Sequence, residues 1–114
     1  TEAPANFSHF AGDLDFSVVD LTKPPSDFLQ GVGEAPLMIA DPPRAGISPP
    51  VRKALVQTRP ARYLLYISCN PNSQIEDLKE ITAAYEPVAA CLVDCYPHTP
   101  HLEQAVLLKR RDPA

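Results

Sequence analysis

Cys69 is the residue of this sequence whose type and position most favour chemistry. It stands in "YISCNP", where an apolar segment ends and Asn70-Pro71 lead into a helix. The free N–H groups and the dipole of a helix N-terminus favour an anion, and therefore the thiolate form of a nearby cysteine. Asn-Pro also forces an extended exit that holds the thiol outward. Position alone leaves a buried structural cysteine equally open, because cysteine is often buried.

Carboxylates stand beside two other apolar segments. Asp41 opens "DPPR" after "PLMIA". It is either an acceptor at the edge of a ligand, with the prolines as a rigid floor, or part of a turn in which Arg44 is solvated. Glu103, at a loop-to-strand junction, would by itself be a surface carboxylate. His98 and His101 have H-x2-H spacing without the further ligands that a metal site needs, so we expect no metal.

The later part of the sequence alternates between apolar segments and helix signals. Ser48 can cap a helix whose first position is Pro49. Ser73 and Glu76 form a capping box that predicts a second helix. Strands are predicted in the apolar segments around these helices, at 36–40, 62–68, 87–95 and 104–110.

The same patterns predict which side chains are buried. The run through 37–40 is apolar without a break, so we expect a parallel strand that is buried on both faces. Cys91 and Cys95 are expected in the core, because free cysteine behaves as a small hydrophobic residue. The second helix is predicted to have an inner face made of Ile75, Leu78, Ile81 and Tyr85.

The predicted element order is therefore β-α-β-α-β-β. Right-handed crossovers make the first three strands parallel, and the last two are expected to form an antiparallel hairpin. This α/β fold class resembles the C-terminal portion of a class I (Rossmann-like) methyltransferase domain, with parallel strands and a final antiparallel strand. Ligands of such sheets bind beyond the carboxyl ends of the strands. Asp41 and Cys69 end adjacent strands and the 94–103 loop leaves the next one, so three polar clusters converge on one edge.

Three separated motifs make the resemblance more specific. "DPPRAGI", "YISCNP" and "DCYPHTPHLEQAVLLKR" are similar to the closing motifs of the RNA (uracil-5-)-methyltransferase family, which forms 5-methyluridine in transfer and ribosomal RNA. The similarity covers about residues 36–111, and "NFSHFAGDLDF" adds a weaker match. It implies that Cys69 is the nucleophile and Glu103 the general base. It also implies that Asp13 and Asp41 contact S-adenosylmethionine.

These implied roles match what the reaction needs. C5 of uracil is a poor nucleophile, and a thiolate that adds to C6 converts the ring into an enolate able to attack a sulfonium methyl group. A base must then remove the C5 proton before the thiol leaves. The implied partner is an RNA whose target base is unstacked and flipped into the site.

Parts of the family pattern are absent from these 114 residues. We find no Gly-rich loop after a first strand, no acidic residue after a second, no oligonucleotide-binding domain and no cysteine set for an iron–sulfur cluster. We therefore expect a fragment that is inactive alone and lacks the N-terminal part of the enzyme. Residues 1–35 are a poorly defined segment that could hold a short strand around Phe7 to Phe10, and residues 36–114 form the C-terminal part of the catalytic domain. The free edge of the first strand predicts a homodimer or a cover formed by 1–35.

Composition limits the remaining alternatives. The net charge of −4 argues against a basic nucleic-acid surface, so most phosphate contacts must lie elsewhere. Three cysteines without a C-x2-C pair argue against a disulfide framework or a zinc site. No signal peptide or membrane-length apolar run is visible, so we expect a cytoplasmic location. The alternative function is a non-catalytic α/β scaffold or RNA-binding module with a structural Cys69. A cytosine-C5 RNA methyltransferase is disfavoured because "DPPRAG" has no cysteine.

Overall fold

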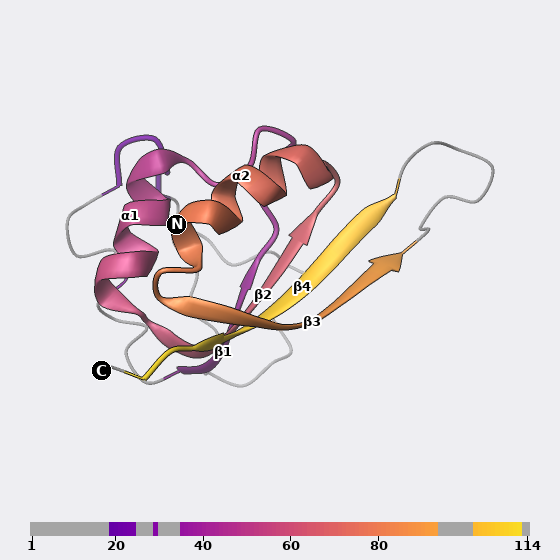
Figure 1. Cartoon of the computed structure of the whole chain (residues 1–114). Helices are drawn as coiled ribbons and strands as arrows, with labels where there is room; N and C mark the ends of the chain where they lie inside the picture. The colour runs from indigo at the N-terminus through magenta and orange to yellow at the C-terminus, as the bar shows by residue number, and fades with distance from the viewer. Residues whose placement is uncertain (1–18, 25–28, 30–34, 94–101, 113–114) are drawn as a thin grey trace, which may run out of the picture.

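The computed structural model describes residues 19–24, 29, 35–93 and 102–112 (Figure 1). The predicted strand near residues 7–10 lies outside them, as do four residues discussed above, Asp13, Cys95, His98 and His101. The described elements follow one another as β1 (Ala35–Ala40), α1 (Pro49–Thr58), β2 (Ala61–Ser68), α2 (Pro71–Ile81), β3 (Tyr85–Val93) and β4 (Glu103–Arg110). The predicted order of elements is confirmed.

Within the described residues, four strands form one mixed sheet in the order β1-β2-β4-β3. β1 and β2 are parallel, and β4 is antiparallel to both β2 and β3. The first three strands of the sequence therefore run in one direction and the last is reversed, which confirms the predicted α/β fold. The prediction that β3 lies beside β2 is wrong, because β4 lies between them.

Prolines mark both outer strands of the described sheet. Pro36 is the second residue of β1, and Pro87 lies in β3 at an irregularity of the ladder between Pro87 and Ala89. Proline has no N–H to donate to a neighbouring strand, so it is tolerated at edges and bulges. β4 has no proline and carries the apolar run AVLL, which suits a central strand. These residues explain why β4, and not β3, pairs with β2.

Both helices pack on one face of the sheet (Figure 1). On that face Leu64 of β2 lies opposite Leu108 of β4, and both side chains are 0% exposed. Burial of a side chain of this size stabilises a fold by about 1.5–3 kcal/mol. The core cluster joins buried side chains of strands and helices, including Leu55, Leu64, Tyr66, Ile81, Val106 and Leu108.

The opposite face of the sheet carries apolar side chains that α1 and α2 do not cover. Ile39 of β1 lies opposite Leu65 of β2 on this face. Leu37 and Ile39 are 46% and 60% exposed. The prediction that β1 is buried on both faces is therefore wrong, because both described helices lie on the other side. Cys91 of β3 is also exposed, so its predicted core position is wrong.

α1 begins where the sequence predicts, but without the predicted cap. Its first residue is Pro49 and its N-cap position is Ser48. The Ser48 hydroxyl donates to the Leu21 carbonyl at 2.5 Å and makes no capping bond to the helix. Ser48 therefore connects α1 to the segment before β1.

α2 begins earlier than predicted. Its first residue is Pro71, and its N-cap Asn70 accepts a hydrogen bond from the Asn72 N–H at 3.2 Å. Ser73 consequently lies inside the first turn, and Glu76 forms an ion pair with Lys79 instead of a capping box. The predicted capping box is wrong because Asn-Pro already starts the helix.

The buried face of α2 also differs from the predicted one. Gln74, Asp77 and Ile81 are buried, and Leu78 packs against the core from a partly buried position. The predicted inner face is therefore right for Leu78 and Ile81. It is wrong for Ile75, which is 52% exposed, and for Tyr85, which is buried but is the first residue of β3 and not part of the helix. Two polar residues, Gln74 and Asp77, therefore occupy the inner face of α2.

Candidate active site

Cys69 lies in the short turn between β2 and α2. Ser68 is the last residue of β2, and Asn70 is the N-cap of α2. The predicted position, between a strand end and a helix N-terminus, is confirmed. The thiol is free and exposed, so the interpretation of Cys69 as a buried structural cysteine is wrong.

Local hydrogen bonds fix the shape of this turn. The buried Ser68 hydroxyl donates to the Asn70 carbonyl and accepts from the Asn70 N–H, both at 3.0 Å. The Asn70 side chain caps α2 through the Asn72 N–H at 3.2 Å. These partners are two residues apart in each case. These local bonds therefore shape the backbone on either side of Cys69.

The loop after β1, residues 41–48, contacts this turn directly. The side-chain amide of Asn70 and the hydroxyl of Ser73 both donate to the carbonyl of Arg44, at 3.1 Å and 2.9 Å. Both donors belong to the start of α2, and the acceptor is the backbone of the loop. The loop after β1 and the Cys69 turn are therefore joined.

A buried carboxylate of α2 holds the far end of that loop. Asp77, 3% exposed, accepts from the Ile47 N–H at 2.8 Å and from the Arg52 guanidinium at 3.1 Å. It also accepts a hydrogen bond from the Tyr66 hydroxyl. These donors offset the cost of burying the charge. Burial raises the pKa of Tyr66 far above its ordinary value, and the bond to Asp77 adds to the rise.

Gly46 lies against the same carboxylate. Its φ is +91°, and its N–H donates to the Pro43 carbonyl at 2.8 Å. A Cβ at this position would lie 2.6 Å from Oδ2 of Asp77. Only glycine meets both the backbone conformation and the close contact without strain. The glycine of "DPPRAGI" is therefore explained by Asp77.

Glu103 begins β4 beside the end of β2. The last pair of the β2–β4 ladder is Ser68 with Gln104. Cys69 and Glu103 are therefore the next residues along these two strands at that end. Glu103 is half-buried and pairs with Val93 on its other side. Because β4 lies between β2 and β3, Glu103 is nearer to Cys69 than the predicted strand order would place it.

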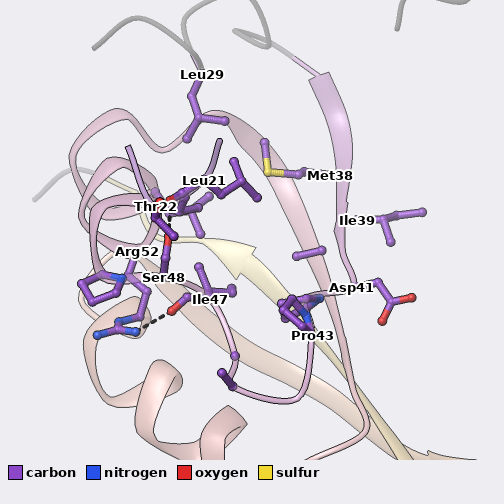
Figure 2. A pocket seen from close by; sticks show the side chains of 17 residues that line it. Leu21, Thr22, Leu29, Met38, Ile39, Asp41, Pro43, Ile47, Ser48 and Arg52 are labelled. Carbon is purple, nitrogen blue, oxygen red and sulfur yellow. Dashed lines mark hydrogen bonds between the residues drawn. The ribbon is translucent and has the colours of Figure 1, made fainter. Parts of the chain in front are cut away.

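Asp41 follows β1 at the same edge of the sheet. Ala40 pairs with Tyr66 of β2, which places Asp41 one strand away from Cys69. Asp41 is exposed, and Figure 2 shows its carboxylate directed away from the side chains of Leu21 and Met38. The carboxylate is therefore open to a ligand beyond the strand ends, where ligands of such sheets bind.

A cavity of about 620 Å³ lies behind the loop after β1, between β1, α1 and the segment around Leu21 (Figure 2). It is within the size range of ligand pockets, ~300–1,000 Å³. Its lining is mainly apolar and includes Leu21, Leu29, Met38, Ile47, Val51 and Leu55.

Three polar side chains of this lining are engaged within the protein, whereas Asp41, which also lines the cavity, is exposed. Thr22 donates to Asp20 at 2.6 Å, Ser48 to the Leu21 carbonyl, and Arg52 to Asp77. Apart from the Asp41 carboxylate, the cavity therefore offers a ligand mainly apolar contact. We place the candidate active site at the strand ends instead, where the exposed thiol and carboxylates lie.

Sequence reasoning missed Gln74, Asp77 and Arg52. For α2, Asn70-Pro71 indicates where the helix begins, because it is an N-cap followed by proline at the first helical position, but it does not show which polar residues face inward. No comparable signal identifies Arg52, whose partners lie in α2 and in the loop.

Within the described ranges no group of three or more His, Cys, Asp and Glu side chains gathers as a metal site. No helix of these ranges is long and apolar enough to cross a membrane. The expectation that His98 and His101 bind no metal remains a prediction, because both lie outside the described residues.

The fold and the site together define a class of protein. A mixed sheet with one reversed strand, and with polar groups at the carboxyl ends of its parallel strands, is the arrangement of the C-terminal portion of a class I methyltransferase domain. A family profile described as tRNA (Uracil-5-)-methyltransferase matches residues 34–111. The chain belongs to this family.

Individual relatives are similar over the same region. An uncharacterized RNA methyltransferase of Bacteroides thetaiotaomicron is 35% identical over 106 residues, which cover 93% of this chain and 22% of the relative. A tRNA/tmRNA (uracil-C(5))-methyltransferase of Shewanella sediminis is 42% identical over 74 residues, or 65% of this chain and 20% of the relative.

A solved structure shares the fold as well. The crystal structure of Pyrococcus abyssi tRNA (uracil-54, C5)-methyltransferase in complex with S-adenosyl-L-homocysteine matches with a TM-score of 0.57 and 38% identity. The match covers 63% of this chain and 18% of that one. The chain therefore spans about a fifth of the length of the relatives that it matches.

Proposed function

We propose that this chain is part of an enzyme that transfers a methyl group from S-adenosylmethionine to C5 of a uridine in transfer or ribosomal RNA. The observation that carries the proposal is the exposed Cys69 at the end of β2, with Glu103 at the corresponding position of the adjoining strand. A nucleophile and a base on neighbouring strands can act on the same pyrimidine. Relatives named as uracil-C5 methyltransferases support this reaction.

The two side chains are assigned to different steps. The thiolate of Cys69 attacks C6 of uracil, which forms a C6–S bond and converts the ring into an enolate. Once C5 has been methylated, Glu103 removes the proton from C5. The C5–C6 double bond then forms again, the C6–S bond breaks, and Cys69 leaves as a thiolate. The target base must be unstacked from the RNA to reach these groups.

The carboxylate at the sheet edge is a suitable binding group for S-adenosylmethionine. Asp41 is an exposed carboxylate, and the ligand carries hydroxyl and amino donors together with a positive charge. We propose Asp41 and Asp13 as its contacts, with Asp13 outside the described residues. When bound, the ligand supplies the electrophilic methyl group that C5 takes up.

The longer protein is proposed to supply most of the remaining contacts. The chain spans 18–22% of the length of the relatives described above. Its net charge of −4 also fits this proposal, because RNA phosphates are bound by basic side chains. Residues 1–114 alone should therefore bind S-adenosylmethionine weakly. Calorimetric titration tests this, and a low-micromolar Kd, about −8 kcal/mol, would contradict it.

We further propose that the free edge of β1 is covered by residues 1–35 or by a second copy of the chain. β1 is an outer strand of the described sheet, and its Leu37 and Ile39 are exposed. Exposed edges invite pairing between chains. A monomer in sedimentation whose β1 amides exchange rapidly would contradict both forms.

The exposed thiols of Cys69 and Cys91 fit a reducing cytoplasm as the location.

Two substitutions in the full-length enzyme separate the proposed steps. Cys69→Ala should abolish methyl transfer and leave the fold intact. Glu103→Gln keeps the shape and removes the basic carboxylate, so a protein–RNA adduct that already carries the new methyl group should accumulate. Mass spectrometry of the enzyme incubated with RNA and S-adenosylmethionine measures both. His98→Gln and His101→Gln are the controls, because these imidazoles are rival bases in the same loop.

The outcomes distinguish the proposal from its alternative. Substantial turnover by Cys69→Ala would refute the proposed mechanism and favour a scaffold or RNA-binding module. Normal turnover by Glu103→Gln, or a stall before methyl transfer, would show that another residue removes the proton.

A further inference from the structure

Gln74 is a fully buried polar side chain in the first turns of α2. It is 0% exposed, and its amide nitrogen donates to the Tyr66 carbonyl at 3.1 Å and to the Gln104 carbonyl at 3.2 Å. The two acceptors belong to different strands, β2 and β4. One amide group therefore connects the helix to two strands at once.

The two carbonyls lie close to the proposed catalytic residues. Gln104 directly follows Glu103. Tyr66 lies in β2, and two residues separate it from Cys69. The β2–β4 ladder ends at the pair of Ser68 and Gln104, beyond which neither catalytic residue is held by this ladder. The amide of Gln74 thus acts on the last paired part of both strands.

The hydrogen bonds of Gln74 are not explained by the stability of the core alone. The other polar atom of the side chain, Oε1 of Gln74, is buried and has no hydrogen-bond partner among the described residues. A buried acceptor without a partner lowers stability, and an apolar side chain of similar size would avoid this loss. The amide is therefore explained better by the two strands that it connects than by the stability of the core.

We propose that Gln74 is a positioning residue that sets the placement of Cys69 relative to Glu103. It touches neither the substrate nor the reacting atoms, and it acts by holding the ends of β2 and β4 in register. This inference rests on the proposed function, because it assumes that the two side chains act on one pyrimidine.

The expected effect follows from the order of the steps. Substrate binding does not require the two residues to be correctly spaced, but removal of the C5 proton from the Cys69 adduct does. Misplacement of a catalytic group by about 1 Å can lower a rate ~100-fold. Loss of the amide of Gln74 should therefore lower kcat by roughly 10- to 100-fold and leave KM for RNA within about threefold.

The test uses Gln74→Met in the full-length enzyme, because methionine has a similar length and no donor. Ile81→Val is the matched control, since Ile81 is also buried in α2 but lies at its other end. Gln74→Met should lower kcat as stated and increase the fraction of enzyme trapped as a methylated RNA adduct. Ile81→Val should lower the melting temperature without either change.

Each outcome decides a different question. An active wild type with an equally active Gln74→Met would overturn this inference and leave the proposed function standing. A fall in activity that only raises KM, or that Ile81→Val reproduces at equal stability, would also overturn it. An inactive wild type, or an active Cys69→Ala, would instead refute the proposed function. If Gln74→Met does not fold, Gln74→Glu is measured in its place, and an unchanged kcat again overturns the inference.

Discussion

The turn after β2 and the loop after β1 reach the same edge of the sheet but are held there by different contacts. The turn is fixed by bonds between residues two apart, those of Ser68, Asn70 and Asn72. The loop is fixed by the bond from Ile47 to Asp77, 30 residues apart in the sequence. The backbone shape around the nucleophile is therefore set mainly by neighbouring residues, whereas the place of the Asp41 loop depends on the packed helices.

This difference predicts an order of mutational effects. Changes to the distant support should cost most, because they leave a charge or a donor buried without its partner. Changes to the local turn should lower the free energy of unfolding by less, since its bonds are partly accessible to solvent and each contributes only a small amount.

The largest effect is expected from Asp77→Ala. The substitution removes the acceptor of Ile47 and Tyr66 and leaves the guanidinium of Arg52 without its buried partner. Breaking a buried ion pair from one side typically costs about 3–5 kcal/mol of unfolding free energy. Urea unfolding measures this.

Glu80→Ala is the matched control for that prediction. Glu80 is the second carboxylate bonded to Arg52, but its side chain is 45% exposed. An exposed ion pair contributes ~0–1 kcal/mol. Equal losses for Asp77→Ala and Glu80→Ala would show that the loop does not depend on the buried carboxylate.

The next effect is expected from Gly46→Ala. The residue has φ +91°, and the new Cβ would meet Asp77 at 2.6 Å. Forcing a side chain into such a conformation costs about 1–3 kcal/mol. In the double variant with Asp77→Ala the clash is gone. The double variant should therefore lose less unfolding free energy than the two single variants lose in total. Strict additivity in urea unfolding would argue against contact between these residues.

A smaller effect is expected from Asn70→Ala in the turn. The variant loses the N-cap of α2 and one of the two bonds to the Arg44 carbonyl. Loss of an N-cap typically costs about 1 kcal/mol. Asn72→Ala, which keeps the N–H that the cap uses, should change stability by less than ~0.5 kcal/mol. The comparison fails if thermal unfolding ranks the two variants in the opposite order.

The smallest effect should appear only in alkali. Burial raises the pKa of Tyr66 and of Tyr85 in the folded state. The unfolded tyrosines lose their protons first, near pH ~10, so the stability due to the neutral phenols is complete below that pH. It is lost as the pH rises from there through the folded pKa. Tyr66→Phe should unfold with a weaker alkaline dependence, and the remainder should belong to Tyr85. A slope identical to that of the wild type would contradict the assignment.

The parts of the fold that the sequence predicts are those with local signals. Apolar runs ended by Asp41-Pro42 and by Cys69-Asn70 place two strand ends correctly. The direction of each strand also follows, because right-handed crossovers fix the parallel strands and the hairpin reverses the last. The position of Cys69 between a strand end and a helix start is already indicated by the six residues of "YISCNP".

The parts that it does not predict depend on competition between distant segments. Pro87 is a local signal that β3 is an edge strand, but that β4 takes the place beside β2 depends on both strands together. Asp77 is buried where Ile75 is expected, because the hydrogen bonds from Ile47 and Tyr66 favour burial of the carboxylate. These outcomes require the relative energies of several packed elements, which local patterns do not contain.

The Arg44 carbonyl accepts hydrogen bonds from both Asn70 and Ser73, and this shared acceptor links binding at the Asp41 loop to binding at Cys69. A ligand that shifts the loop at Asp41 would disturb the support of Cys69, and so change the affinity for whatever binds at the thiol. Thermodynamic reciprocity then requires the reverse influence to have the same magnitude. Two binding events at this edge would therefore be energetically coupled through a single peptide oxygen.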